Sequence, residues 1–405
     1  MAKIEQFVER AIRSLPEHAL SLLEQRKREG KSVIVYVGMS GGVDSSVSAY
    51  ILKMAGFDVR GVFIKVWQPD DIDCTWKEDR RDAMRVAAVL GIPFQTIYLE
   101  DEYKKYVADY MLDEYKAGRT PNPDIMCNKY VKFGAYFEAA MEAGADFVAT
   151  GHYARTRSLR TRANVSEDQD IFPQVEMLIS KDEIKDQTYF LWATESTRLR
   201  HMLFPVGSLI KEDVRMIAEH AKLPVFAKKD SQGVCFIGKF DMKEFLQKYL
   251  HTEQGNVLDL DGNIIGDHDG ALLYTIGERH GFRIWNSSPD TAPRFVIEKD
   301  IEQNTITVGL EKQLMDKDRS KTAVLNSVNF LSKDRGTSSN IKARIRHRQK
   351  LQSVKVEPFM IKQHDGTMDV FKIDITFKEA QQGIAAGQSC VLYDGEICLG
   401  GGIIE

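Results

Sequence analysis

The stretch Val33-Ile-Val-Tyr-Val-Gly-Met-Ser-Gly-Gly-Val-Asp-Ser-Ser46 decides the fold of the first half of the chain. Its first five residues are apolar and mostly β-branched, which predicts a buried parallel strand. A glycine turn begins at Gly38, and the pattern after it is that of an amphipathic helix, with Val47, Tyr50, Ile51 and Met54 on one face. Because glycines let backbone N–H groups approach a phosphate, this arrangement predicts an anion site at a helix start.

The spacing of the glycines separates this turn from two common phosphate loops. No Gly-Lys-Ser/Thr ends it, so it is not a Walker A loop, and it lacks the Gly-x-Gly-x-x-Gly spacing of dinucleotide sites. Ser40-Gly-Gly-Val-Asp-Ser45 resembles instead the pyrophosphate loop of the ATP pyrophosphatases, which adenylate a substrate and release pyrophosphate. The alternative is a glycine turn before a serine-capped helix, with no ligand.

Length and composition indicate a large globular protein of several domains. The chain has 405 residues, 43% hydrophobic and 28% charged, which predicts two or three domains. A net charge of −4 does not by itself indicate a nucleic-acid binder, so any such role needs local basic patches. No apolar run approaches the roughly 18 residues of a membrane span, and the acidic N-terminus is no typical signal or transit peptide. We expect a cytoplasmic protein with no membrane partner.

The order of predicted elements divides the chain into four parts. Residues 1–32 form two short helices broken at Pro16, a packing appendage. Residues 33–245 alternate strand and helix, which predicts an α/β domain with a parallel sheet covered by helices on both faces. Glycine turns and short alternating strands then predict a small, mostly β central domain over 246–310 and a β-barrel over 315–405.

Within the first domain we expect strands at 33–37, 59–67, 94–99 and 146–150, and helices at 78–90, 103–117, 127–143, 185–191 and 211–220. In such a sheet the ligand lies at the carboxyl ends of the strands, so the loops after Val37, Val66 and Thr150 should converge. Residues 155–162, with four arginines, look like the start of an exposed polar loop, either solvated or in contact with a polyanion.

Five cysteines without a Cys-x-x-Cys pair exclude a disulfide framework and a standard zinc site, so no metal ligands are assigned. Cys127 follows two prolines at an expected helix start beside Lys129 and Lys132, a setting that lowers the pKa of a thiol. Its alternative, a small buried hydrophobe, fits these polar neighbours poorly. Cys235, in Asp-Ser-Gln-Gly-Val-Cys, is at least as compatible with simple burial, and Cys74, Cys390 and Cys398 read as structural.

Six motifs in order resemble those of the bacterial-type tRNA-uridine 2-sulfurtransferases, the 2-thiouridylases of the PP-loop ATP pyrophosphatase superfamily. They cover about residues 33–405 and are Ser-Gly-Gly-Val-Asp-Ser-Ser (40–46), Ala-Gly-Arg-Thr-Pro-Asn-Pro-Asp-Ile-Met-Cys-Asn-Lys (117–129), Ala-Thr-Gly-His-Tyr (149–153), Lys-Asp-Gln-Thr-Tyr-Phe-Leu (185–191), Asp-Ser-Gln-Gly-Val-Cys-Phe-Ile-Gly (230–238) and Cys-Leu-Gly-Gly-Gly-Ile-Ile-Glu (398–405).

The resemblance implies that ATP adenylates the 2-oxygen of the wobble uridine of tRNA, and that sulfur then displaces AMP. Cys235 would carry the sulfur as a persulfide, received from a sulfur carrier or cysteine desulfurase. Cys127 would attack that persulfide or assist the transfer, and Asp124 would contact the base as a general acid or base. Mg²⁺ would neutralise the phosphates.

The same resemblance implies two sets of binding residues. The ATP contacts would be Gly38, Met39, Ser40, Gly41, Gly42, Val43, Asp44, Ser45, Ile64 and Gly151. The tRNA contacts would be Asn122, Pro123, Asp124, His152, Lys185, Asp186, Gln187, Arg346, His347 and Gln388.

A basic strand supports the tRNA role independently. In Lys342-Ala-Arg-Ile-Arg-His-Arg348 the even positions are all basic, and a strand would project them from one face. Such a face suits a polyanion, with a log-affinity slope of roughly −0.7 to −0.9 per phosphate contact against log salt. A solvated basic strand is the alternative.

The sequence is also compatible with two other functions. An adenylating ligase or amidotransferase could use the same loop but would not need Cys127 and Cys235, so replacing each cysteine by serine separates it from a sulfurtransferase. A non-enzymatic tRNA-binding module built on the C-terminal barrel would bind tRNA without consuming ATP.

Overall fold

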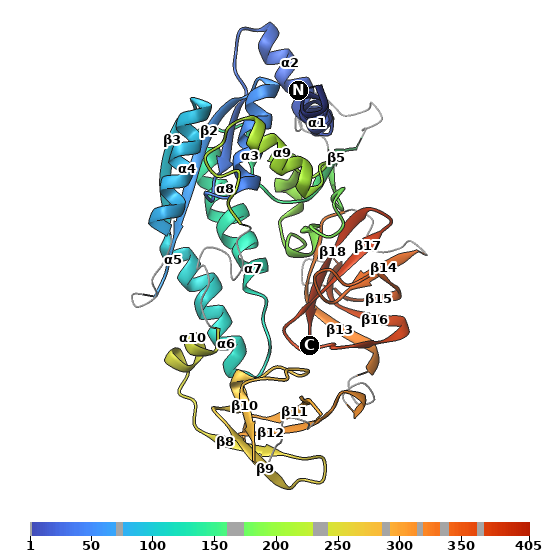
Figure 1. Cartoon of the computed structure of the whole chain (residues 1–405). Coiled ribbons are helices and arrows are strands. Elements are labelled where there is room, and N and C mark those ends of the chain that lie inside the picture. The colour runs from blue at the N-terminus through green and yellow to red at the C-terminus, as the bar shows by residue number, and fades with distance from the viewer. Residues whose placement is uncertain are drawn as a thin grey trace.

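A computed structural model describes residues 2–69, 76–159, 174–229, 242–285, 292–313, 319–332, 340–362 and 368–405, with the backbone alone at 242, 319, 358–362 and 368–371. Cys74 and the whole motif at 230–238, with Cys235, therefore lie outside the described residues. Within the described part the strands form a parallel sheet, a middle sheet and a C-terminal barrel (Figure 1).

The predicted parallel sheet is present in the order β3-β2-β1-β4-β7. All four pairings are parallel, and the strands are β1 (Ile34–Gly38), β2 (Asp58–Val66), β3 (Phe94–Leu99), β4 (Phe147–Ala149) and β7 (Met202–Leu203). Val35 and Val37 enter one hydrophobic core and Tyr36 another, as alternation along a strand requires. Both faces of the sheet are therefore buried, as we expected.

Ten α-helices lie in the described residues, and they are α1 (Ala2–Arg13), α2 (Glu17–Arg28), α3 (Val43–Ala55), α4 (Trp76–Leu90), α5 (Glu100–Tyr103), α6 (Tyr110–Lys116), α7 (Pro123–Met126), α8 (Tyr136–Glu142), α9 (Lys211–His220) and α10 (Met242–Tyr249). π-helical turns at Lys104–Asp109 and Cys127–Ala135 join α5 to α6 and α7 to α8. The break at Pro16 is confirmed. The helix expected over 185–191 is wrong, because only a 3₁₀ turn forms at Thr188–Phe190.

The middle sheet has the order β10-β9-β8-β12-β11. Its strands are β8 (Gly255–Leu258), β9 (Ile264–His268), β10 (Phe282–Ile284), β11 (Arg294–Asp300) and β12 (Thr305–Leu310). The apolar side chains of this sheet share a core with Met111 and Tyr115 of α6. The middle sheet thus lies at the end of the α5–α6 arm (Figure 1).

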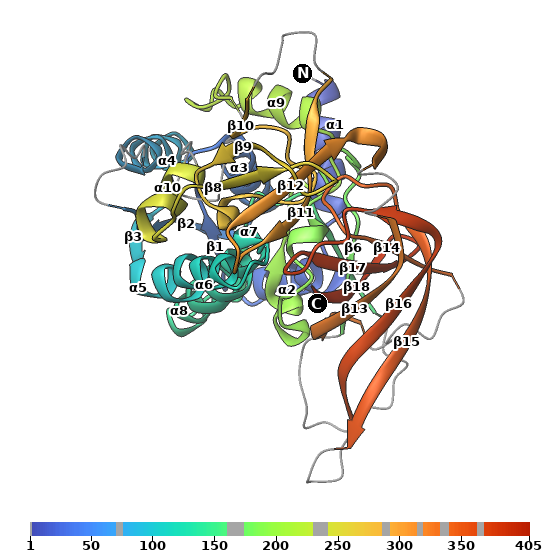
Figure 2. The ribbon, with the colours of Figure 1, turned by 90° about the horizontal axis from the view of Figure 1, so that it is seen from below.

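The C-terminal sheet closes into a six-stranded barrel, because β13 pairs with β18 as well as with β16. The strands are β13 (Arg319–Phe330), β14 (Ile341–Arg344), β15 (Gln352–Lys362), β16 (Met368–Gln382), β17 (Ser389–Asp394) and β18 (Ile397–Ile404). The hairpin expected at 393–396 joins β17 to β18. The barrel lies beside the parallel-sheet domain in both views (Figure 2).

A strand hairpin from the first domain extends the barrel sheet. β5 (Arg155–Ser158) pairs with β6 (Val175–Leu178), which in turn pairs with β18 through Leu178 and Ile397. The expected exposed loop is therefore wrong at residues 155–158, because the backbone there pairs in a sheet. The rest of that segment, 160–173, lies outside the described residues.

The expected basic strand face is also wrong. β14 ends at Arg344, so residues 346 and 348 do not continue its alternation. Arg344 is itself buried: its guanidinium lies 3.3 Å from the Asp186 carboxylate and 4.7 Å from the centroid of the Tyr393 ring. Lys342 on the same strand is exposed. One of the four basic residues thus docks the barrel on the first domain.

The buried ion pair between the two domains yields a prediction on stability. Arg344→Met should lower the free energy of unfolding by about 3–5 kcal/mol, because it leaves the buried Asp186 carboxylate without its cation. Lys342→Met, on the same strand but exposed, should change it by less than about 0.5 kcal/mol. Urea unfolding of the two variants measures the difference, and equal effects would contradict the role given to the pair.

Candidate active site

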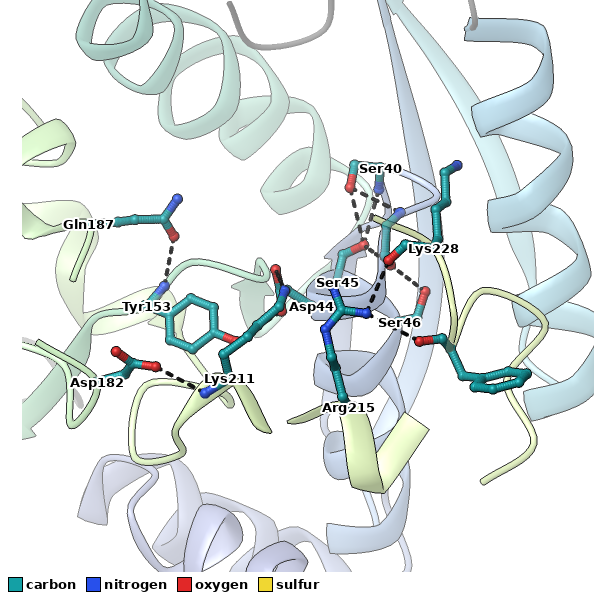
Figure 3. A network of polar contacts seen from close by, with 12 residues as sticks. Ser40, Asp44, Ser45, Ser46, Tyr153, Asp182, Gln187, Lys211, Arg215 and Lys228 are labelled. Atoms are coloured by element: carbon teal, nitrogen blue, oxygen red, sulfur yellow. Dashed lines mark hydrogen bonds and ion pairs between the residues drawn. The ribbon is translucent and has the colours of Figure 1, made fainter. Parts of the chain in front are cut away.

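The glycine loop lies where β1 ends and α3 begins. Gly42 is the N-cap of α3, and the hydroxyls of the loop bond within it: the Ser40 N–H donates to Ser45 Oγ (3.2 Å), and Ser46 Oγ donates to the Gly42 carbonyl (2.7 Å) (Figure 3). The loop thus holds its own shape while the start of α3 supplies the N–H groups and dipole that favour a phosphate.

Two glycines in this site allow backbone segments to approach closely. Gly41 has φ +74°, and a Cβ there would lie 2.2 Å from the Asp79 carbonyl oxygen of α4. A Cβ on Gly151, after β4, would lie 2.5 Å from the Ser45 nitrogen. The loops after β1 and β4 therefore converge as we expected. The loop after β2 is described only to residue 69.

Asp44 lies at the centre of a polar knot beside the loop. Its two carboxylate oxygens lie 2.7 and 2.8 Å from Lys211 Nζ, and the Tyr153 hydroxyl donates to one of them at 2.9 Å (Figure 3). Lys211 was not predicted from the sequence. The available signal was its position as the first residue of a helix, where the dipole disfavours a cation unless an anion lies nearby.

The knot extends to one of the predicted tRNA contacts. The Tyr153 N–H donates to Gln187 Oε1 and the Gln187 N–H donates to the Tyr153 carbonyl, both at 2.9 Å. Asp182, a few residues earlier, accepts the Lys211 backbone N–H at 2.9 Å. The segment at 182–187 is therefore fixed directly to the residues that surround Asp44 (Figure 3).

Lys228 anchors the chain that leads toward Cys235. Its ammonium donates to Asp79 and Asp82 of α4, both at 2.8 Å, and Arg215 donates to its carbonyl at 3.1 Å. Because α4 also covers Gly41, the last described turn before residue 230 is attached next to the glycine loop. Cys235 itself lies outside the described residues, so its distance from Cys127 stays a prediction.

Cys127 is fully buried near the start of the α7–α8 helix. This helix begins at Pro123, earlier than we expected, and Asn122 caps it by accepting the Ile125 N–H at 3.4 Å. Burial raises the pKa of the Cys127 thiol to about 12, although Lys132 acts to lower it. The expected low thiol pKa is therefore wrong for this conformation, because desolvation outweighs the helix start and the lysine.

A buried lysine links the thiol to the glycine loop. Cys127 is the first residue of a π-helical turn. In such a turn a residue and the one five positions later lie on nearly the same side of the helix, and five positions after Cys127 is Lys132. Lys132 Nζ lies 3.5 Å from His152 Nε2, and His152 Nδ1 lies 2.7 Å from Thr150 Oγ1. His152 follows Gly151 directly, so a single chain of contacts joins the Cys127 helix to the loop.

This link predicts unequal roles for two neighbouring lysines. Lys132→Met should slow any reaction of the Cys127 thiolate by about 10- to 100-fold near pH 8, because the cation that lowers the pKa of Cys127 is lost. The rate should recover as the pH is raised. Lys129→Met is the matched control, since Lys129 is part-exposed over the Tyr130 ring, and its pH–rate profile should match the wild type. Identical profiles for the two variants would contradict this role.

The other predicted ATP contacts lie around the loop. The Met39 N–H donates to the Val62 carbonyl at 2.8 Å, and the side chains of Met39, Val43 and Ile64 are buried. Ile64 lies within β2, near its carboxyl end. Their contact with ATP stays a prediction.

The predicted tRNA contacts gather where the barrel meets the first domain. His347 Nε2 lies 2.9 Å from the Asp186 carbonyl, and Gln388 donates to the Thr120 carbonyl at 2.7 Å, beside the Asn122 turn. The side chains of Asp186 and His152 are buried, whereas Arg346 is exposed. The structure thus brings these segments together, and their binding of tRNA stays a prediction.

Burial of a histidine next to β5 predicts a pH effect on stability. His18 donates from Nε2 to the Arg200 carbonyl (2.7 Å), and burial lowers its pKa. In the unfolded chain the histidine has a pKa of about 6.5, so it binds a proton more tightly there than in the folded protein. The stability that neutral His18 contributes is therefore lost as the pH falls below about 6.5. Thermal unfolding from pH 7.5 to 5.5 should therefore show a steeper fall in Tm for the wild type than for His18→Gln. Parallel profiles would contradict the prediction.

Two features are absent from the described residues. No described helix has the length and apolar character needed to cross a membrane. No described group of three or more His, Cys, Asp or Glu residues could hold a metal ion.

The parallel sheet with a glycine loop after its central strand is that of a PP-loop ATP pyrophosphatase domain. Three family models match the chain in order: a tRNA methyl transferase HUP domain at 33–239, a tRNA methyl transferase PRC-barrel domain at 243–310 and an aminomethyltransferase β-barrel domain at 320–404. The chain belongs to the tRNA-specific 2-thiouridylase family.

Relatives along nearly the whole chain carry that name. "tRNA-specific 2-thiouridylase MnmA" of Lysinibacillus sphaericus is 44% identical over 93% of this chain and 96% of its own length. The protein of the same name from Pediococcus pentosaceus is 42% identical over 92% and 94%, and that from Streptococcus mutans is 44% identical over 92% and 95%.

Proposed function

We propose that this protein is an ATP-dependent tRNA-uridine 2-sulfurtransferase that converts the wobble uridine of tRNA to 2-thiouridine. Membership of the 2-thiouridylase family supports the reaction. The observation that carries it for this chain is the contact of His152, beside the glycine loop, with Lys132, whose charge acts to lower the pKa of the buried Cys127 thiol on the same π-helical turn.

The first step activates an oxygen that is otherwise a poor leaving group. The uridine 2-oxygen attacks the α-phosphorus of ATP, and pyrophosphate departs toward the loop at Ser40–Ser45. The N–H groups at the start of α3 stabilise its charge, and Asp124 exchanges a proton with the base. Lys211, held by Asp44, lies beside this loop as a further cation. Mg²⁺ bound with ATP would neutralise phosphate charge. Asp44, the carboxylate of this loop, already pairs with Lys211, so no protein ligand is assigned to the metal.

The second step replaces the activated oxygen by sulfur. A sulfur carrier or cysteine desulfurase delivers a persulfide to Cys235. In one route the terminal sulfur attacks C2 and AMP leaves, and the Cys127 thiolate then attacks Cys235 and releases the thiouridine. In the other, Cys127 attacks the persulfide first, and the sulfide released attacks C2. Both routes leave a Cys127–Cys235 disulfide, which an external thiol must reduce before the next turnover.

The burial of Cys127 gives this mechanism a conformational requirement. A thiol with a pKa of about 12 is protonated at neutral pH, so it becomes a nucleophile only when its environment changes. We propose that tRNA binding across Asn122, Gln187 and the barrel residues Arg346 and Gln388 opens the site. Because both the sulfur donor and the tRNA substrate would be met in the cytoplasm, we propose that the protein acts there.

Two of the family models are described as tRNA methyl transferase domains, and two further alternatives came from the sequence. Methyl transfer needs no adenylating loop, whereas the loop and knot at Asp44 suit ATP. A ligase or amidotransferase would need neither Cys127 nor Cys235. A non-enzymatic tRNA binder would leave ATP intact.

The test is incubation of the purified protein with tRNA, ATP, Mg²⁺, a thiol reductant and a persulfide donor. We expect 2-thiouridine by nucleoside mass spectrometry, together with tRNA-dependent release of pyrophosphate. Pyrophosphate with a different modified nucleoside would favour another adenylating enzyme. Binding of tRNA without consumption of ATP would favour the non-enzymatic alternative.

A further inference from the structure

The two N-terminal helices lie before the first residue that the family models match, and they pack on the ATP-loop side of the sheet. α1 contacts both α3, which follows the glycine loop, and α9 (Figure 1). The buried side chains of Val8 and Ala11 share one core with Val47 of α3 and Val214 of α9. α1 is therefore an integral part of the wall behind the ATP site.

Polar contacts of α1 concentrate on one turn of α9. The Arg10 guanidinium forms an ion pair with the Asp213 carboxylate, whose side chain is 9% exposed. Ser14 Oγ lies 2.8 Å from Ser208 Oγ, just before α9 begins. By contrast, Arg13 pairs with Glu9 on the exposed face of α1. Two long-range contacts thus hold the start of α9 against α1.

The same turn carries the lysine that binds Asp44. Lys211 is the first residue of α9, where the helix dipole disfavours a cation, and its ammonium is held by the Asp44 carboxylate. Asp213 lies in that first turn and is nearly buried, so without a cation it would be driven toward solvent. Such a movement would carry Lys211 with it, because the two residues share one rigid helical turn.

We propose that Arg10 is a positioning residue for ATP: through Asp213 it fixes the first turn of α9, so that Lys211 stays on Asp44 beside the glycine loop. The proposal deepens the proposed function and rests on it for the identity of the nucleotide. It assigns the N-terminal helices a role in ATP use, beyond the packing role that the sequence indicated.

The test is calorimetric binding of an ATP analogue with a methylene bridge between the α- and β-phosphates, which cannot release pyrophosphate. In the full-length protein Arg10→Gln should weaken its binding by about 5- to 20-fold. Arg13→Gln is the matched control in the same helix and should bind as the wild type does. Arg10→Lys, which keeps the charge, should recover most of the affinity. The affinity for tRNA should change by less than about twofold in each variant.

A double-mutant cycle separates positioning from simple stabilisation. If Arg10 acts through Lys211, Arg10→Gln should weaken binding no further in a Lys211→Met background, whereas independent effects would multiply. The exchanged pair Arg10→Asp with Asp213→Arg should recover binding if charge pairing is what matters. Thermal unfolding of each variant shows that it is folded at the assay temperature.

The results that would overturn the role of Arg10 differ from those that would overturn the proposed function. Wild-type affinity in Arg10→Gln, or multiplicative effects with Lys211→Met, would overturn the positioning role. If Arg10→Gln does not fold, Arg10→Lys and the exchanged pair still decide it, because loss of affinity in both while they remain folded would contradict it. A wild type that binds the analogue but makes no 2-thiouridine would contradict the proposed function and leave this binding test intact.

Discussion

Cys235→Ala and Cys127→Ala are each expected to lower 2-thiouridine formation by at least about 1,000-fold, the largest effects that we predict. The first substitution removes the sulfur atom of Cys235 on which the persulfide forms. The second removes the Cys127 thiol that attacks that persulfide or the disulfide formed from it. Adenylation precedes both roles, so a single burst of pyrophosphate should persist in each variant. Quenched-flow assays of pyrophosphate and 2-thiouridine on the same samples measure the two steps.

Cys390→Ala is the control for those variants. Cys390 is a buried thiol of the barrel core, far in the chain from both Cys127 and Cys235. The substitution should lower Tm slightly and leave the rate of thiolation within about threefold of the wild type. Turnover in Cys127→Ala or Cys235→Ala equal to that of Cys390→Ala would exclude a sulfur relay through these residues.

Gly41→Ala is expected to abolish ATP use, with a loss of at least about 100-fold in pyrophosphate release. A Cβ at this position would lie 2.2 Å from the Asp79 carbonyl, so either the loop or the start of α4 must move. φ at Gly41 is +74°, which adds backbone strain for alanine. Burst-phase measurements of pyrophosphate with saturating tRNA test this directly.

Gly144→Ala separates the two causes. Gly144 has φ +84°, and nothing lies within 4 Å of a Cβ placed there, so it shares the strain of Gly41 but not the collision. We expect a modest loss of stability and normal ATP use. Equal losses of ATP use in both variants would show that backbone strain alone, and not the contact with α4, explains the effect.

The parallel sheet and its loop could be predicted from sequence because their signals are local. The apolar run at 33–37, the glycines after it and the helical period that follows lie within about twenty positions, and α9 was expected at its observed bounds. The strand at 155–158 was missed because its partner, β6, follows only after a long polar segment. Pairing across such a distance leaves no local pattern.

Long-range polar contacts explain the other errors. The sequence alone suggests that Arg344 is a surface residue, because its buried partner, Asp186, is far away in the sequence. Cys127 has polar neighbours in sequence, but the core that closes over it comes from other elements. Lys211 was missed for the same reason, since Asp44 lies on another helix. The partners of these three residues are distant in the sequence, so only the fold identifies them.

The proposed reaction depends above all on ATP activating the uridine 2-oxygen by adenylation. The most direct measurement uses tRNA whose wobble uridine carries oxygen-18 at position 2, with analysis of the AMP formed by mass spectrometry. We expect one oxygen-18 atom in AMP for each 2-thiouridine made, because that oxygen leaves bonded to the α-phosphorus. Thiolation with AMP that contains no oxygen-18 would contradict it.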